Sequence, residues 1–191
     1  SRTGVVKEVT KYNANGTVDG VYDFEIYQKV NAEGDYDVSG VELIAQFPLN
    51  MVHKSLDGFG INANFTMLDN SLTGESDLGI PTPPEGLADE TYNLTFYYET
   101  DTWGGRVAGA HRSDYINSVE GGLRDHDESG FHATTYIDFS AFYKVSEALK
   151  LSVEAINLTN QREEQYSDSN DRLYNTTTSG RTYSAGFSYK F

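Results

Sequence analysis

The chain contains no cysteine, only four prolines and two methionines, and far fewer basic than acidic residues. The absence of cysteine excludes disulfide scaffolds, thiolate zinc centres and cysteine nucleophiles. The 14 Lys and Arg residues stand against 29 Asp and Glu residues and give a formal charge of −15. Because nucleic-acid binding exchanges basic side chains for counterions on phosphates, we expect no nucleic-acid partner.

Long apolar runs are also missing. No stretch approaches the roughly 18 apolar residues of a membrane-spanning helix, which argues against a helical membrane protein. A membrane β-barrel stays possible, because its alternating strands keep the mean hydropathy low, and here it is −0.53. What the chain has instead is aromatic residues, which make up 13% of its 191 residues. That content is too high for a disordered acidic tail and indicates a folded chain, with one domain as the default at this length.

The apolar residues recur with a period of two. In the final segment, Tyr183, Phe187 and Tyr189 alternate with polar or small residues, which predicts a strand over 180–191. No window shows the apolar spacing of a helix with caps. The sequence therefore predicts an all-β, antiparallel fold. The same alternation predicts strands at 38–47, 58–68, 89–99, 103–112, 133–146 and 148–158, with a weaker one at 22–30 and a short element at 5–10.

The connections between these strands alternate in length from residue 70 onward. Long segments at 70–88, 113–132 and 159–179 take turns with short ones at 100–102 and 147. Outer-membrane barrels have short periplasmic turns, long outer loops and strands of about 9 to 11 residues. The opposite face of the strands is polar and carries Arg106, Arg112, Asp138, Lys144, Lys150, Glu154 and Lys190.

Aromatic residues are expected at both ends of the strands. We place Trp103, Tyr143, Tyr183, Tyr189 and Phe191 toward the short-turn ends, and Tyr92 and Tyr115 toward the long-loop ends. Two such groups would form the aromatic girdles of a membrane barrel. This placement favours a barrel over a soluble sandwich, whose strands would show the same alternation.

A series of short motifs over residues 35–191 resembles the C-terminal part of the barrel of TonB-dependent outer-membrane receptors. The series is specific in its order and spacing, although each motif alone is weak. The motifs are Gly40-Val41-Glu42-Leu43, Asn93-Leu94-Thr95-Phe96-Tyr97-Tyr98-Glu99, Arg106-Val107-Ala108, Arg112-Ser113-Asp114-Tyr115, Thr135-Tyr136-Ile137-Asp138, Glu154-Ala155-Ile156-Asn157-Leu158-Thr159-Asn160, Gly180-Arg181-Thr182-Tyr183 and Tyr189-Lys190-Phe191.

The resemblance implies transmembrane β-barrel strands that form the C-terminal portion of a barrel of about 22 strands with a plug in its lumen. It also implies a location in the bacterial outer membrane and a function in the import of an iron chelate, a cobalamin-like cofactor or an oligosaccharide. The implied partners are outer-membrane lipid, the rest of the barrel with its plug, TonB through an N-terminal part, and the barrel-assembly machinery. The chain is expected to be a fragment, with 35–191 as barrel strands and 1–34 as an extracellular loop or weakly structured lead-in.

Two other interpretations stay open from the sequence. Seven strands plus the weak segment at 22–30 would make a complete eight-stranded outer-membrane barrel used for adhesion or stability. A soluble β-sandwich that binds carbohydrate would show a similar alternation.

The loops hold the candidate binding residues, and we expect no catalytic residues, cofactor or metal site. His111, Ser113 and Asp114 have the residue types of a triad, but adjacent strand residues point to opposite faces. The cluster around His126 matches no ordered metal-ligand spacing. Loop aromatic rings could stack on a ligand. The weak ligand-binding candidates are Tyr115, Arg124, Asp125, His126, Phe131, Tyr166, Arg172 and Tyr174.

The last strand is also expected to act as an assembly signal. Its alternating aromatic side chains resemble the segment that the barrel-insertion machinery reads. Strand addition would supply the physical basis, because an unpaired edge offers backbone groups to a partner. The residues assigned to this signal are Tyr183, Phe187, Tyr189 and Phe191.

Overall fold

The computed structural model describes residues 2–29, 38–70, 74–75, 81–82, 84–118, 129–167 and 169–191. The chain divides into two compact units, Ser1–Tyr36 and Asp37–Phe191. Among the described residues, no helix is both long and apolar enough to cross a membrane.

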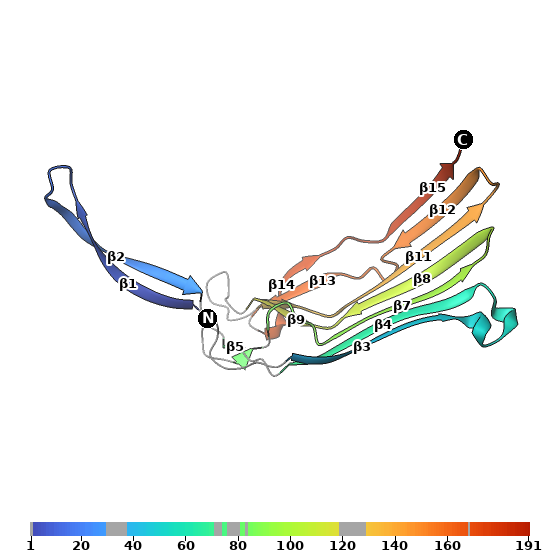
Figure 1. Cartoon of the computed structure of the whole chain (residues 1–191), viewed down its shortest axis with the longest axis horizontal. Helices are drawn as coiled ribbons and strands as arrows, with labels where there is room; N and C mark the ends of the chain where they lie inside the picture. Colours follow the sequence, from blue (N-terminus) through green and yellow to red (C-terminus); the bar gives the residue numbers. More distant parts are fainter. Residues whose placement is uncertain are drawn as a thin grey trace. The chain divides into compact units, whose positions relative to one another are not determined.

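The larger unit is built on a seven-stranded antiparallel sheet, which we call the wall (Figure 1). The strand order β15-β12-β11-β8-β7-β4-β3 follows the chain, so each wall strand pairs with the next one along the sequence. The sheet is open, with β3 and β15 at its edges. The all-β, antiparallel prediction is therefore confirmed. The wall strands are β3 (Val38–Pro48), β4 (Phe59–Asn70), β7 (Glu90–Glu99), β8 (Trp103–Arg112), β11 (Thr134–Lys144), β12 (Leu149–Ile156) and β15 (Thr182–Tyr189).

The register places apolar residues on one face of the wall and polar residues on the other. One row of directly paired residues runs across all seven strands on the apolar face: Phe47, Ile61, Phe96, Val107, Phe139, Ala155 and Tyr183. The next row lies on the opposite face: Pro48, Gly60, Tyr97, Arg106, Ser140, Glu154 and Ser184. Period-two alternation in every strand, combined with this register, makes one side apolar from edge to edge.

The apolar face of the wall is uncovered. Leu43, Phe96 and Val153 are all exposed, as are most of the large side chains around them. A soluble sandwich would cover such a face with a second sheet about 10 Å away. Because no second layer covers it in the described part of the chain, the structure does not fit the sandwich interpretation.

Short and long connections lie at opposite ends of the wall. The short ones are residues 100–102, residues 145–148 and the turn between β3 and β4, which holds the 3-10 turns η1 (Leu49–Met51) and η2 (Lys54–Leu56). Trp103 pairs with Tyr143, and Tyr189 pairs with Leu149, at this short-turn end, as expected.

The expected position of Tyr183 was wrong. Residue 183 pairs with Ala155 at the start of β15, directly after the long loop, so its side chain lies toward the long-loop end. The reason is strand direction: β15 runs from the long-loop end to the short-turn end, so only its last residues reach the short-turn end.

The long segments contain short strands of their own. β9 (Tyr115–Ser118), β10 (Ser129–Phe131), β13 (Glu163–Ser167) and β14 (Ser169–Thr177) form a four-stranded sheet, which we call the loop sheet. Its order, β14-β13-β10-β9, repeats the order of the wall strands β15, β12, β11 and β8 from which these segments extend. A further pair, β5 (Gly74–Glu75) and β6 (Pro81–Thr82), lies in the first long segment.

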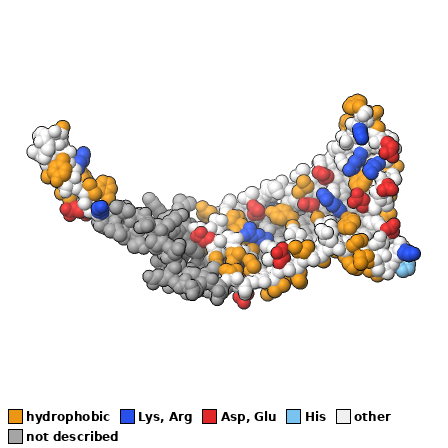
Figure 2. All heavy atoms as spheres, viewed as in Figure 1, with side chains coloured by type: hydrophobic (Ala, Val, Ile, Leu, Met, Phe, Trp, Pro, Cys, Tyr) orange, Lys and Arg blue, Asp and Glu red, His pale blue; other side chains and the backbone are white. Residues whose placement is uncertain are grey.

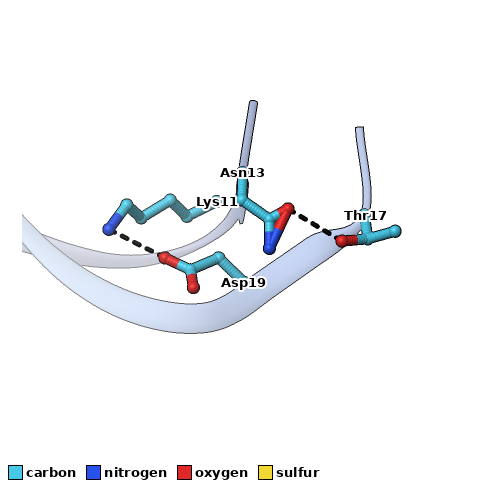
Figure 3. Close-up of polar contacts among 4 residues, drawn as sticks. All are labelled: Lys11, Asn13, Thr17 and Asp19. Atoms are coloured by element: carbon cyan, nitrogen blue, oxygen red, sulfur yellow. Dashed lines mark hydrogen bonds and ion pairs between the residues drawn. The ribbon is translucent and has the colours of Figure 1, made fainter. Parts of the chain in front are cut away.

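The smaller unit is a hairpin of β1 (Arg2–Tyr12) and β2 (Val18–Lys29). In its turn, the Thr17 hydroxyl donates to Asn13 Oδ1 at 2.7 Å, and Gly16 takes a φ of 80°, which glycine adopts without steric cost. Lys11 and Asp19 form an ion pair at 2.8 Å beside the turn (Figure 3). The segments expected as strands at 5–10 and 22–30, the latter as far as residue 29, thus belong to one longer hairpin, in which β2 pairs with β1.

Candidate functional site

A line of side-chain hydrogen bonds separates the wall from the loop sheet. At this boundary the backbone N–H of Ala133 donates to an Asp114 carboxylate oxygen. The N–H of Thr135 donates to Gln161 Oε1 at 3.0 Å, and the Thr159 hydroxyl donates to the Thr135 carbonyl at 3.0 Å. Polar side chains thus take over backbone groups where the ladder between strands is interrupted.

Asn157 is the centre of this boundary. It is 2% exposed and has a φ of 57°, a left-handed conformation that Asn tolerates better than most residues. Its backbone N–H donates to Asp138 Oδ1 at 2.8 Å, and its Nδ2 donates to the carbonyls of Gln161 and Gly180, both at 3.1 Å. Its Oδ1 accepts the N–H of Gln161 at 2.7 Å. The buried side-chain amide therefore joins the start of the last long segment to the entry to β15, and the backbone N–H of the same residue joins it to β11.

Sequence reasoning gave Asn157 no role, although it belongs to a motif that carries the family resemblance. An Asn directly after a strand is usually a turn residue with an exposed side chain. The burial that distinguishes Asn157 comes from β15, which returns more than 20 residues later, so no local signal could have revealed it.

The aromatic residues of the loop sheet pack on one another. The rings of Tyr115 and Phe131 stack with centroids 5.1 Å apart. The Arg112 guanidinium carbon lies 3.5 Å from the centroid of the Tyr115 ring, within cation–π range, and Arg112 also donates to the Gly86 carbonyl at 2.7 Å. Tyr115 is therefore held between neighbours, and both it and Phe131 are half-buried.

Tyr166 fills the other side of the loop sheet. It is 4% exposed, its ring centroid lies 5.2 Å from that of His132, and it covers Gly130. A Cβ at position 130 would clash with this ring and would lie 2.6 Å from the Tyr115 carbonyl oxygen. The glycine thus lets β10 fit between its two neighbours.

The three long segments are connected to one another. β10 pairs with β13, which joins the second segment to the third. The N–H of Gly86 donates to the Ile116 carbonyl at 2.6 Å, which joins the first segment to the second. Within the described residues, the candidate binding region is therefore one connected surface and not three independent loops.

The predicted ligand-binding residues fall into three groups. Tyr115, Phe131 and Tyr166 lie in the loop sheet. Of these, Tyr166 is buried and the other two are half-buried. Arg172 and Tyr174 are exposed on β14. Arg124, Asp125 and His126 lie outside the described residues. A ligand role for any of them stays a prediction.

The polar face of the wall carries charges of both signs. The Arg106 Nε donates to the Ser140 hydroxyl at 3.0 Å, and the Ser184 hydroxyl donates to Glu154 Oε2 at 3.4 Å. Lys150 Nζ lies 4.4 Å from the ring centroid of Phe142. Figure 2 shows basic and acidic side chains next to one another over the wall. Because its charges are of both signs, the polar face has no large net charge, and water or another polar protein surface can cover it.

Comparison with known families yields one match. Residues 7–158 match the family model described as TonB dependent receptor-like, beta-barrel. No curated protein and no solved structure matches the chain. The match runs from β1 through β12 and covers 152 of 191 residues, well over half of the chain. The chain therefore belongs to the TonB-dependent receptor-like β-barrel family, whose members are outer-membrane receptors and transporters.

Proposed function

We propose that the wall is part of an outer-membrane barrel that imports a small ligand in TonB-dependent uptake. The observation that carries this proposal is the uncovered apolar face opposite a polar face with balanced charges. In water, an exposed apolar surface of this extent is unfavourable at about 25 cal/mol per Å². In a barrel, the same face contacts lipid while the polar face lines the lumen.

The open edges of the wall support a larger barrel. In lipid, each unpaired backbone group costs several kcal/mol, so β3 and β15 need partner strands. We propose that the remainder of the barrel supplies these strands and that a plug domain contacts the polar face. TonB would act through that other part of the receptor.

The long-loop end is the proposed ligand-binding side. The connected loop sheet presents a fixed surface, which lowers the entropy cost of ordering loops around a ligand. Its exposed polar groups and half-buried aromatic rings suit a chelate, a cofactor or an oligosaccharide. Among the candidates, Tyr115 and Tyr174 test this role best, because the Tyr115 ring is held by Arg112 and Phe131 and Tyr174 lies exposed on β14.

Sidedness and uptake together test the function. An epitope tag inserted at residues 76–80 should bind antibody on intact cells, whereas one inserted at residues 100–102 should require permeabilised cells. Uptake of radiolabelled iron chelates, cobalamin and oligosaccharides should reveal a substrate that is lost without TonB. Alanine at Tyr115 and Tyr174 should reduce that uptake while the amount of assembled protein stays unchanged. Labelling of the tag at 100–102 on intact cells would contradict the proposed topology.

A further inference from the structure

The turn between β3 and β4, residues 49–58, is unlike the other short connections. It spans ten residues and contains both η1 and η2, whereas the other two short connections of the wall, 100–102 and 145–148, have three and four residues. Its backbone is held internally: the N–H of Val52 donates to the Leu49 carbonyl at 3.0 Å, and that of Leu56 donates to the His53 carbonyl at 3.0 Å. The side chains of Asn50 and Asp57 close the turn with a hydrogen bond of 3.1 Å.

This ordered turn exposes two adjacent apolar side chains. Met51 is 72% exposed and Val52 is 66% exposed, while Leu56 in the same turn is half-buried. Both are more exposed than Phe47, at 40%, which is the last apolar-face residue of β3 before the turn. Backbone hydrogen bonds within the turn hold its conformation, so Met51 and Val52 are presented at fixed positions.

The turn continues the apolar face of the wall. It is flanked by Phe47 and Phe59, which both lie on that face at the short-turn end. Phe59 also begins an aromatic row there: its ring centroid lies 4.4 Å from that of Tyr98, which in turn lies 4.6 Å from that of Trp103. Aromatic rows at the ends of barrel strands mark the level of the lipid headgroups.

Polar side chains that can meet phosphates follow the apolar pair directly. His53 and Lys54 are exposed and come immediately after Val52 in the chain. Lys54 supplies the positive charge, whereas His53 Nδ1 accepts the N–H of Ser55 at 3.2 Å, so His53 can contact a phosphate only as a hydrogen-bond donor through Nε2. Figure 2 shows a Lys or Arg side chain beside a His side chain at the lower right of the molecule, where Figure 1 draws this turn. An apolar pair next to a cation matches the chemistry of a phospholipid interface, where apolar side chains enter the acyl boundary and cations meet phosphates.

We propose that the turn 49–58 is a lipid anchor, in which Met51 and Val52 insert into the headgroup region of the adjacent phospholipid leaflet and Lys54 and His53 contact its phosphates. Lipid is favoured over a protein partner because the turn is continuous with a face that the proposed function already places in lipid. The inference rests on that membrane placement and adds a contact beyond the wall.

This chain has no cysteine, so each introduced cysteine is the only labelling site within it. We would attach an environment-sensitive fluorophore to Met51→Cys, to Asp101→Cys in the three-residue turn, and to Val153→Cys and Ser152→Cys in the wall. The receptor would be reconstituted together with the rest of its barrel, any cysteine outside this chain replaced by serine, in vesicles of phosphatidylethanolamine and phosphatidylglycerol. Fluorescence at position 51 should shift to the blue, be quenched by lipids brominated near the headgroup, and be protected from iodide. Position 101 should show the reverse.

The wall positions separate failure of this inference from failure of the proposed function. If position 153 is quenched by lipids brominated in the middle of the acyl chains but position 51 is as accessible to iodide as position 101, the anchor is overturned and the barrel stands. If position 153 is not quenched by lipid, the proposed function itself fails. Lys54→Glu should reduce lipid quenching at position 51 in vesicles with phosphatidylglycerol and leave it unchanged in phosphatidylcholine. An equal effect in both vesicles would contradict a contact between Lys54 and the net negative charge of the headgroups.

Discussion

At the scale of single residues, Asn157 contributes most clearly to the order of the long-loop end. A side chain that is almost fully buried must satisfy its own polar atoms, and the Asn157 side chain does so with the backbone of Gln161 and of Gly180, while its backbone N–H donates to Asp138 on β11. Without the Asn157 side chain, the backbone groups that it contacts would have to bond to water at a packed boundary. The residue thus determines where β12 ends and how the chain returns to β15.

Replacement of Asn157 by alanine tests this role. Alanine loses the side-chain hydrogen bonds, at about 1 to 3 kcal/mol for buried groups left unpaired, and tolerates the left-handed backbone poorly, at about 1 to 2 kcal/mol. We expect Asn157→Ala to lower the free energy of unfolding by roughly 2 to 4 kcal/mol in urea titrations of vesicle-bound protein.

Asn160→Ala is the matched control, because Asn160 has a φ of 55° in the same turn. It should lose only the backbone contribution, about 1 to 2 kcal/mol. Equal losses for the two variants would mean that backbone conformation alone accounts for the effect and that the buried amide is not a structural centre.

At the scale of single strands, β12 gives the sharpest test of face assignment. Val153 lies on the apolar face near the middle of the strand, and Ser152 lies on the polar face beside it. Val153→Arg should destabilise the protein in lipid by about 2 to 4 kcal/mol if the residue faces the bilayer midplane. Ser152→Arg should change stability much less, because its side chain would reach the lumen. Similar losses of stability for the two variants, measured by unfolding in vesicles, would refute the assignment of Val153 and Ser152 to opposite faces.

The edge strand β15 carries the proposed assembly signal. Tyr183, Phe187 and Tyr189 lie on its apolar face and are exposed, as is Phe191 just beyond it. If an assembly partner pairs with this edge, Phe187→Ala and Tyr189→Ala should reduce assembly in cells more than refolding into detergent. Ser188→Ala, on the opposite face, is the control. A parallel decrease in both assays would assign these residues to packing alone.

How far a strand could be predicted from sequence depended on its environment. The wall strands alternate strongly, as expected if one face meets a uniformly apolar surrounding, which in the proposed barrel is lipid. In the hairpin, Lys7 shares a face with Val9 and Phe24, and Glu8 lies opposite Asp23, so neither face is apolar and the period is weak. That 1–34 lies outside the membrane stays a prediction.

The loop sheet could not be predicted from its own residues. β10 has only three residues, and the pairing of β9 with β10 and of β13 with β14 is interrupted by register shifts. Its aromatic residues were recognised as candidates, but their packing depends on pairing between segments more than 30 residues apart, such as Phe131 with Gln165. Local periodicity carries no information about such contacts.

At the scale of the whole molecule, the larger unit lacks the interior of a soluble domain. The buried hydrophobic residues among the described ones are Ala88, Ile116, Ala155 and Tyr166, and all but Ala155 belong to the long segments. The wall itself is a single layer held by backbone pairing and cross-strand contacts. A structure of this kind is stable when lipid covers one face and further protein covers the other.

The central claim is that the wall separates lipid from a polar lumen, and β11 tests it most directly. Single spin labels would replace each residue from 135 to 144 in vesicle-bound protein, and collision with oxygen, which concentrates in lipid, would be compared with collision with a water-soluble nickel complex. The account predicts that odd positions, among them Ile137, Phe139 and Tyr143, favour oxygen, and that even positions, among them Asp138 and Ser140, favour nickel. Equal accessibility at neighbouring positions, or the opposite phase, would contradict it.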